Sequence, residues 1–301
     1  MSILRYKKNP ILTRKNVPFE VNSIFNAGAV KIGERYILLC RVELPTGRSH
    51  FVLAESNDGV HFTVAENPCL SPEDHGKWLP YVEWGIEDPR ITHIDGRYYI
   101  LYTGYSRLCP IVMLACTLDF RKFDILGPVC EPSNKDAVLF PEKIDGLYWK
   151  IDRPSADERR DMWINSSPDL LNWGQHRLLI EPQAGSWEQD KIGASTPPVR
   201  TDQGWLMLYH GVRGFGISSM YRQGVLLLDI KEPWNVLHKS SEPILSPEFE
   251  YERVGDVHNV VFSTGWIVEP DSQVKIYYSG ADLNICLATT DVSFLLNNAG
   301  K

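Results

Sequence analysis

A strand-like unit recurs five times along the chain, and this repeat constrains the fold more than any other feature. Each copy is a turn that contains Gly or Asp, followed by an aromatic or aliphatic run that ends in polar residues. The copies are residues 33–41, 95–103, 145–153, 203–210 and 271–278, spaced 50 to 68 residues apart when aligned on Tyr36 and its counterparts. Such a period with several short strands per copy is typical of a β-propeller, whose radial sheets leave few exposed edges.

Two weaker patterns follow the same period. An Asp in a small polar turn lies downstream of each copy, at positions 58, 119, 169, 229 and 291. A short strand, usually with Pro, recurs at 9–12, 67–70, 127–130, 178–181 and 242–245. The last pattern opens the chain and the Asp turn closes it, so we expect the two termini to meet and complete a shared blade.

These patterns predict an all-β fold in which residues 1–301 form one domain, a five-bladed β-propeller. A β-sandwich would leave the regular spacing to coincidence. A helix-rich fold is disfavoured because long stretches with a 3.6-residue apolar period are absent.

Composition excludes several classes of partner. The 31 Lys and Arg residues against 38 Asp and Glu residues give a net charge of −7, whereas a general nucleic-acid binder needs a basic face. No apolar run is long enough for a membrane span. The six cysteines include no C-x-x-C pair, so we expect no metal site, and the N-terminus resembles no secretory leader. We therefore expect a reduced, cytoplasmic protein.

Polar residues near the ends of the repeated strands are the candidates for a ligand site, because these strands should converge on one funnel. Glu87 and Asp88 form an acidic pair flanked by Gly and Pro, which indicates a constrained carboxylate, although such residues often only cap turns. Four candidate cations come from separate segments that should converge: Arg41, Arg153, Lys191 and His210. Like charges repel, so a cationic pocket in an acidic protein favours an anionic ligand, and the Arg fork suits phosphate oxygens. Surface ion pairs and a structural His are the alternatives.

Together these segments resemble glycoside hydrolase family 130, the β-mannoside phosphorylases and their relatives. The resemblance runs from about residue 9 to about residue 290, and the motifs that carry it are 85–90, 134–136 with 139–141, 153–154, 191–193, 204–206 with 209–211, and 278–282. The family has a five-bladed propeller, as the repeats indicate independently.

The resemblance implies inverting phosphorolysis: inorganic phosphate cleaves a β-mannoside to give α-mannose 1-phosphate and a shortened sugar. Asp88 corresponds to the general acid, whose proton is thought to pass through a hydroxyl of the bound mannose. The implied phosphate ligands are Arg153, Lys191, His210, Tyr221 and Asn134. The implied sugar ligands are Asn26, Arg41, Asp282, Tyr209, Trp84, Lys135 and Asp136, with Asp282 as a carboxylate that stays ionised.

The implied reaction uses phosphate as a co-substrate and needs no cofactor, because phosphate already carries the negative charge that water would acquire from a base. The partners are then a β-mannoside oligosaccharide and phosphate, with self-association as a further expectation from the family. A β-1,2 linkage is favoured, while β-1,4 linkages and other acceptors stay open.

Three alternatives to a β-mannoside phosphorylase fit the sequence less well. A hydrolytic β-mannosidase of the same fold would lack the phosphate ligands, which are present here. An arabinanase or invertase type of glycosidase would place a carboxylate on the first copy, where this chain has Asn26. A non-catalytic sugar-binding propeller would account for the aromatic residues but not for the cations beside an isolated acid.

Overall fold

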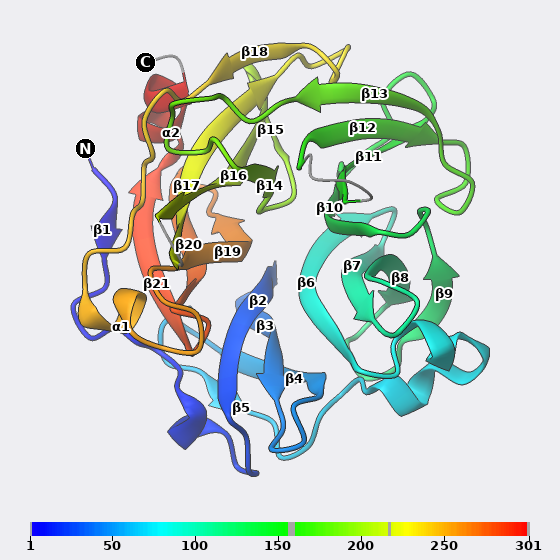
Figure 1. Ribbon diagram of the computed structural model, residues 1–301, viewed down its shortest axis with the longest axis vertical. Coiled ribbons are helices and arrows are strands. Elements are labelled where there is room, and N and C mark those ends of the chain that lie inside the picture. Colours follow the sequence, from blue (N-terminus) through cyan, green and yellow to red (C-terminus); the bar gives the residue numbers. More distant parts are fainter. Residues whose placement is uncertain (1, 156–159, 216–217, 300–301) are drawn as a thin grey trace.

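The structure, a computed structural model, describes residues 2–155, 160–215 and 218–299. Strands make up most of these residues, which confirms the predicted all-β class. The strands form four hydrogen-bonded sheets that surround a common centre (Figure 1). Within the described residues, no helix is both long and apolar enough to cross a membrane.

The largest sheet has eight strands and combines the first two copies of the repeat. Its order is β2-β3-β4-β6-β7-β8-β9, with β5 paired to β4. Only one parallel pair, Ser49 with Gly85, connects β4 to β6, whereas all other pairings in this sheet are antiparallel. The five copies of the repeat thus appear as four sheets. The strands are β2 (Ser23–Ile32), β3 (Arg35–Glu43), β4 (Ser49–Ser56), β5 (Thr63–Val64), β6 (Gly85–Ile94), β7 (Arg97–Tyr105), β8 (Ile111–Thr117) and β9 (Asp124–Pro128).

The other three sheets each correspond to one copy. The third copy forms β10 (Asn134–Leu139), β11 (Tyr148–Pro154), β12 (Met162–Ser167) and β13 (Gly174–Ile180). The fourth forms β14 (Lys191–Ala194), β15 (Val199–Thr201), β16 (Gly204–Phe215), β17 (Ser218–Leu228) and β18 (Val236–Lys239). The fifth forms β19 (Val261–Val268), β20 (Gln273–Gly280) and β21 (Asn284–Asp291), with β1 (Leu4–Arg5) at its edge.

The two ends of the chain meet in that last sheet, as the repeat order predicts. Leu4 pairs with Thr289, and Leu12 forms an isolated bridge with Ile285. The Arg5 Nε also donates a 2.7 Å hydrogen bond to the buried carboxylate of Glu252. Figure 1 shows β1 alongside β21.

Helical segments are short and peripheral to the sheets. They are the 3-10 segments η1 (Arg14–Asn16) and η2 (Pro72–Tyr81) and the α-helices α1 (Glu250–Arg253) and α2 (Val292–Ala299).

The turn residues explain why the strands pair as hairpins. The pair Asp95-Gly96 has φ values of 49° and 78°, and Asp145-Gly146 has 51° and 75°. Two successive positive φ angles define the type I′ turn, whose twist matches that of antiparallel strands. The recurring Asp residues close other turns: Asp58 Oδ1 accepts the backbone N–H groups of Val60 and His61, and Asp169 repeats this pattern.

The strands nearest the centre are β2, β6, β10, β14 and β19 (Figure 1). Three of them share a one-residue bulge, between Phe25 and Gly28 in β2, Glu87 and Arg90 in β6, and Lys135 and Val138 in β10. At each bulge lies a residue with positive φ: Asn26 (44°), Asp88 (55°) and Asp136 (55°). A bulge re-aims side chains, and Asn and Asp tolerate this conformation better than other non-Gly residues. Polar side chains are thereby turned toward the centre, while apolar residues pack between the sheets.

Candidate active site

A cavity of about 280 Å³ lies where the innermost strands converge. Most of the residues singled out in the sequence line it: Asn26, Arg41, Asp88, Lys135, Asp136, Arg153, Lys191, His210, Tyr221 and Asp282. They come from three of the four sheets and from the segment after β20, so the fold brings together residues that are up to 256 positions apart.

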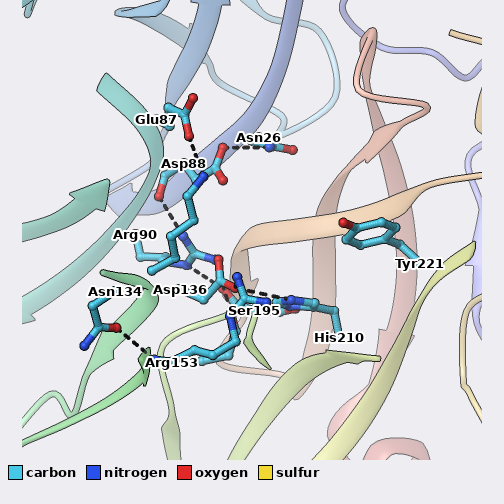
Figure 2. A network of polar contacts seen from close by, with 12 residues as sticks. Asn26, Glu87, Asp88, Arg90, Asn134, Asp136, Arg153, Ser195, His210 and Tyr221 are labelled. Atoms are coloured by element: carbon cyan, nitrogen blue, oxygen red, sulfur yellow. Dashed lines mark hydrogen bonds and ion pairs between the residues drawn. The ribbon is translucent and has the colours of Figure 1, made fainter. Parts of the chain in front are cut away.

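One end of the cavity is a network of carboxylates. Asn26 Nδ2 donates to Asp88 Oδ1 at 2.7 Å, and Arg41 Nη1 donates to the same oxygen at 3.0 Å. The other Arg41 nitrogen, Nη2, binds Glu87 Oε1 at 3.0 Å, while Lys135 Nζ binds Glu87 Oε2 at 2.9 Å. Figure 2 shows Glu87, Asp88 and Asn26 together at this end. Two cations thus hold two adjacent carboxylates in fixed positions.

This network keeps Asp88 ionised in the free protein. Burial would raise the pKa of the carboxyl, but the charges of Arg41 and then Arg90 outweigh it and lower the pKa below its usual value. If Asp88 acts as an acid, its proton must therefore be gained when substrates bind.

Asp136 organises the opposite side of the cavity. Its Oδ2 lies 2.9 Å from Arg153 Nη2 and 3.4 Å from His210 Nε2, and its Oδ1 accepts from Arg90 Nη2 at 3.2 Å. Although burial opposes ionisation, the charge of Arg153, together with a hydrogen bond from His210, holds the pKa of Asp136 well below its usual value. Asp136 is thus a buried anchor for the basic side chains, which differs from the sugar contact that the resemblance implies for it.

Arg90 ties three inner segments together from beneath the cavity. It is 1% exposed and donates to the backbone carbonyl oxygens of Asp88 (2.9 Å), Ala194 (3.1 Å) and Ser195 (3.3 Å). The sequence shows Arg90 only as part of the motif at 85–90, and we did not predict it as a site residue. Its place in that motif is the signal that could have identified it.

Arg153 lines the cavity and carries hydrogen-bond donors that have no partner in the part of the chain that the structure describes. Among the described residues, its buried Nε and Nη1 have no hydrogen-bond partner. Buried guanidinium donors without partners are costly in a folded protein unless a ligand completes them. Beside Arg153, Lys191 Nζ donates to the Tyr221 hydroxyl at 2.5 Å and lies 4.5 Å from the centre of its ring. This end of the cavity therefore offers donors for an anion.

The basic residues at this end differ in charge. Burial lowers the pKa of Lys191 to about 8, with a further contribution from Arg153, so the amine is mostly protonated at neutral pH. Burial lowers the pKa of His210 to about 4 in spite of Asp136. His210 is thus neutral at pH 7 and not the cation expected from the sequence, because the apolar ring of Phe262 packs against it at 4.8 Å between ring centres.

Asp282 also differs from the expectation of a permanently ionised carboxylate. Burial and the nearby charge of Asp88 raise its pKa to about 7, against a smaller opposing effect of Arg41. Its carboxyl group therefore changes charge near neutral pH.

Three predicted residues do not line the cavity. Tyr209 is fully buried in the core, and its hydroxyl donates to Glu188 Oε2 at 2.7 Å. Side chains alternate along a strand, so Tyr209 points away because its neighbour His210 points in. Asn134 is buried and uses its Oδ1 to accept the Arg153 backbone N–H at 3.1 Å, so it supports the strand that carries Arg153. Trp84 is 48% exposed and lies just before β6, outside the cavity.

Several lining residues were not predicted. They are Glu87, which we had named only as one of an acidic pair, and the apolar Val257, Val260 and Phe262. The apolar residues carry no sequence signal that separates them from the core. Within the ranges that the structure describes, no group of three or more His, Cys, Asp or Glu side chains is placed to hold a metal ion.

The cavity thus has two chemically different ends (Figure 2). Carboxylates and an amide at one end suit the hydroxyl groups of a neutral polar ligand. Unpartnered Arg donors and a Lys at the other end suit an anion. Asp88 belongs to the carboxylate end.

Known proteins are similar to this chain over most of their length. A β-1,2-mannobiose phosphorylase of Thermoanaerobacter sp. is 37% identical over 96% of this chain and 97% of its own. A β-1,4-mannooligosaccharide phosphorylase of Ruminococcus albus is 34% identical over 96% and 88%. The structure of the β-1,2-mannobiose phosphorylase of Listeria innocua in complex with β-1,2-mannobiose superposes with a TM-score of 0.92 at 31% identity, covering 99% of both chains. Residues 3–300 match the sequence profile of glycoside hydrolase family 130, described as beta-1,4-mannooligosaccharide phosphorylase, and the chain belongs to that family.

Proposed function

We propose that the protein catalyses reversible, inverting phosphorolysis of a β-mannoside, giving α-mannose 1-phosphate and a shortened sugar. The observation that carries this proposal is the pair of buried, unpartnered Arg153 nitrogens at the far end of a cavity whose near end holds Asp88. Phosphate needs fixed cationic donors and no general base, and the cavity supplies those donors.

In this proposal Asp88 is the general acid, and Asn26, Arg41 and Asp282 bind the mannosyl unit. Arg153, Lys191 and Tyr221 hold the phosphate, with His210 as a neutral partner. Bound phosphate adds negative charge to the cavity, and a nearby negative charge raises the pKa of a carboxyl group. Phosphate binding would therefore help Asp88 to carry the proton that the leaving oxygen needs.

We propose a β-1,2-linked substrate. The names of the Thermoanaerobacter and Listeria relatives favour this linkage, while the name of the Ruminococcus relative keeps β-1,4 linkage as the alternative. A hydrolytic β-mannosidase is the second candidate activity. The intact set of phosphate-type donors argues against it, and also against a sugar-binding protein without activity.

We also propose that the fold is a five-bladed β-propeller and a single domain. Only the Ser49–Gly85 pair joins β2–β5 to β6–β9, which supports reading the eight-stranded sheet as two blades of a five-bladed propeller. The pairing of β1 with β21 supports a single domain over 1–301. Phosphate would serve as co-substrate without a cofactor. A cytoplasmic location is supported by the chemistry, since a charged sugar phosphate does not cross a lipid bilayer unaided. Self-association is proposed from the family alone, and light scattering tests it.

The test is cleavage of β-1,2-mannobiose with and without phosphate, with products resolved by ion chromatography and phosphorus NMR. We expect cleavage to depend on phosphate and to give the α-anomer of mannose 1-phosphate. Free mannose at equal rates in phosphate-free buffer would establish the hydrolase instead. β-1,4-mannobiose in parallel reactions decides the linkage.

A further inference from the structure

Two outer cavities adjoin the central one, at opposite chemical ends. One, of about 420 Å³, shares Arg41 and Glu87 with it, at the carboxylate end. The other, of about 380 Å³, shares Lys191 and Tyr221 with it, at the phosphate-type end. The two ends are separated across the network that Figure 2 displays, with Glu87 on one side and Tyr221 on the other.

The outer cavity at the carboxylate end suits a neutral sugar. Its wall includes Trp84 and Tyr105, whose ring centres lie 5.5 Å apart in an edge-to-face pair, and both side chains are exposed. Aromatic faces and hydrogen-bonding groups are what a sugar ring contacts. The same wall carries two carboxylates, Glu43 and Glu87, against two arginines, Arg41 and Arg48, so it has no net positive charge to select a phosphate dianion.

The outer cavity at the other end suits an anion. Arg160 and Lys191 line it, and it reaches the surface at the exposed residues Asp190 and Gly214. The Asp190 carboxylate accepts the backbone N–H of Gly214, which offsets part of its charge. The Lys191–Tyr221 pair stands between this cavity and the central one, and both side chains are only half-buried.

The chemistry of inversion makes a second entrance useful. In an inverting displacement the nucleophile approaches the face of the sugar opposite the leaving group. A mannoside whose leaving sugar extends toward Glu87 and Trp84 would then fill the central cavity in front of the phosphate site. With one entrance, bound mannoside would prevent phosphate from entering.

We propose that phosphate enters the active site through the cavity lined by Arg160, Lys191, Ser219 and Tyr221, separately from the mannoside, which enters past Trp84 and Glu87. The inference rests on the proposed phosphorolysis. If phosphate has its own entrance, it can bind to the enzyme–mannoside complex before the mannoside dissociates.

The test measures how fast radiolabelled phosphate associates with the Asp88→Asn protein, by rapid filtration, with and without saturating β-1,2-mannobiose. This background prevents turnover while both ligands bind. We expect bound mannobiose to leave the association rate within about threefold of its value without sugar. If bound mannobiose slows phosphate association to the rate at which mannobiose itself dissociates, the proposal is overturned. This measurement needs no variant other than Asp88→Asn.

Two matched substitutions locate the entrance. Ser219→Trp narrows the outer cavity at Lys191, and Thr46→Trp narrows the one at Trp84. In the Asp88→Asn background, we expect Ser219→Trp to slow phosphate association about tenfold or more when mannobiose is bound, and little when it is absent, because the other entrance is then free. Thr46→Trp should slow mannobiose association and leave that of phosphate unchanged.

Equal effects of the two substitutions on phosphate would overturn the proposal. The cleavage assay with the unaltered protein separates this result from a failure of the proposed function. If cleavage depends on phosphate but bound mannobiose blocks phosphate binding, only the second entrance is rejected. If hydrolysis proceeds without phosphate, both the second entrance and the proposed phosphorolysis are rejected.

Discussion

Asn26 and Asp88 lie 62 residues apart in the chain, yet they occupy the same bulge position in β2 and β6 and share a 2.7 Å hydrogen bond. The repeat thus places a polar residue with positive φ at equivalent points of neighbouring inner strands, and the site is built where these points converge. The same position in the third copy holds Asp136, so one structural device supplies both the proposed acid, Asp88, and the anchor of Arg153.

Replacing Asp88 by Asn should remove nearly all turnover while leaving the fold intact. Asn tolerates the positive φ of this position and can still accept from Asn26 and Arg41, but it cannot donate a proton. We expect kcat for phosphorolysis to fall by roughly 10²–10⁴-fold, the usual contribution of a general acid. Thermal unfolding serves as the control for folding, and turnover like that of the unaltered protein would contradict the assignment.

Replacing Arg153 by Lys should weaken phosphate binding selectively. Lys keeps a positive charge near Asp136 but loses the guanidinium donors that have no partner among the described residues. Charge-assisted hydrogen bonds are worth about 1.5–3 kcal/mol each, so we expect the KM for phosphate to rise about 10–100-fold. The KM for the mannoside is the internal control. A change confined to the mannoside would place Arg153 on the sugar side instead.

The pKa of Lys191, lowered to about 8, predicts how phosphate use depends on pH. The amine is charged below this pKa and neutral above it, so kcat/KM for phosphate should fall as pH rises through about 8. Rates are best compared at equal concentrations of the phosphate dianion, because inorganic phosphate itself loses a proton near neutral pH. In Lys191→Arg, whose guanidinium stays protonated, the fall should disappear. An unchanged profile in that variant would assign the transition to another group.

The repeat and its turns could be predicted from the sequence because they depend on local chemistry. Asp95-Gly96 specifies its hairpin through two positive φ angles, and the order of the patterns predicts that the termini meet. The convergence of polar residues also follows, since every inner strand presents its end to the same centre. These features need no knowledge of how one sheet packs on the next.

What could not be predicted depends on register and burial. The choice between Tyr209 and His210 turns on which residue of β16 faces inward, and only the pairing with β14 determines this. The single Ser49–Gly85 pair, which merges two copies into one sheet, leaves no trace in the spacing. The neutral state of His210 and the raised pKa of Asp282 arise from burial by distant segments.

Replacing Arg90 should lower the stability of the fold, although this residue lies directly beside the site. The bulge at Asp88 turns the 1% exposed Arg90 beneath the cavity, where it holds Asp136 and three backbone carbonyl groups. Arg90→Met keeps much of the side-chain volume but leaves these acceptors without their donor. Removing one member of a buried ion pair typically costs about 3–5 kcal/mol, so we expect a loss of that size in the free energy of unfolding, measured with urea. Arg35→Met is the matched control, since the Arg35–Glu55 pair is about half exposed and such pairs contribute about 0–1 kcal/mol. Equal losses in the two variants would mean that Arg90 does not connect β6 to β10 and β14 in the way that its contacts indicate.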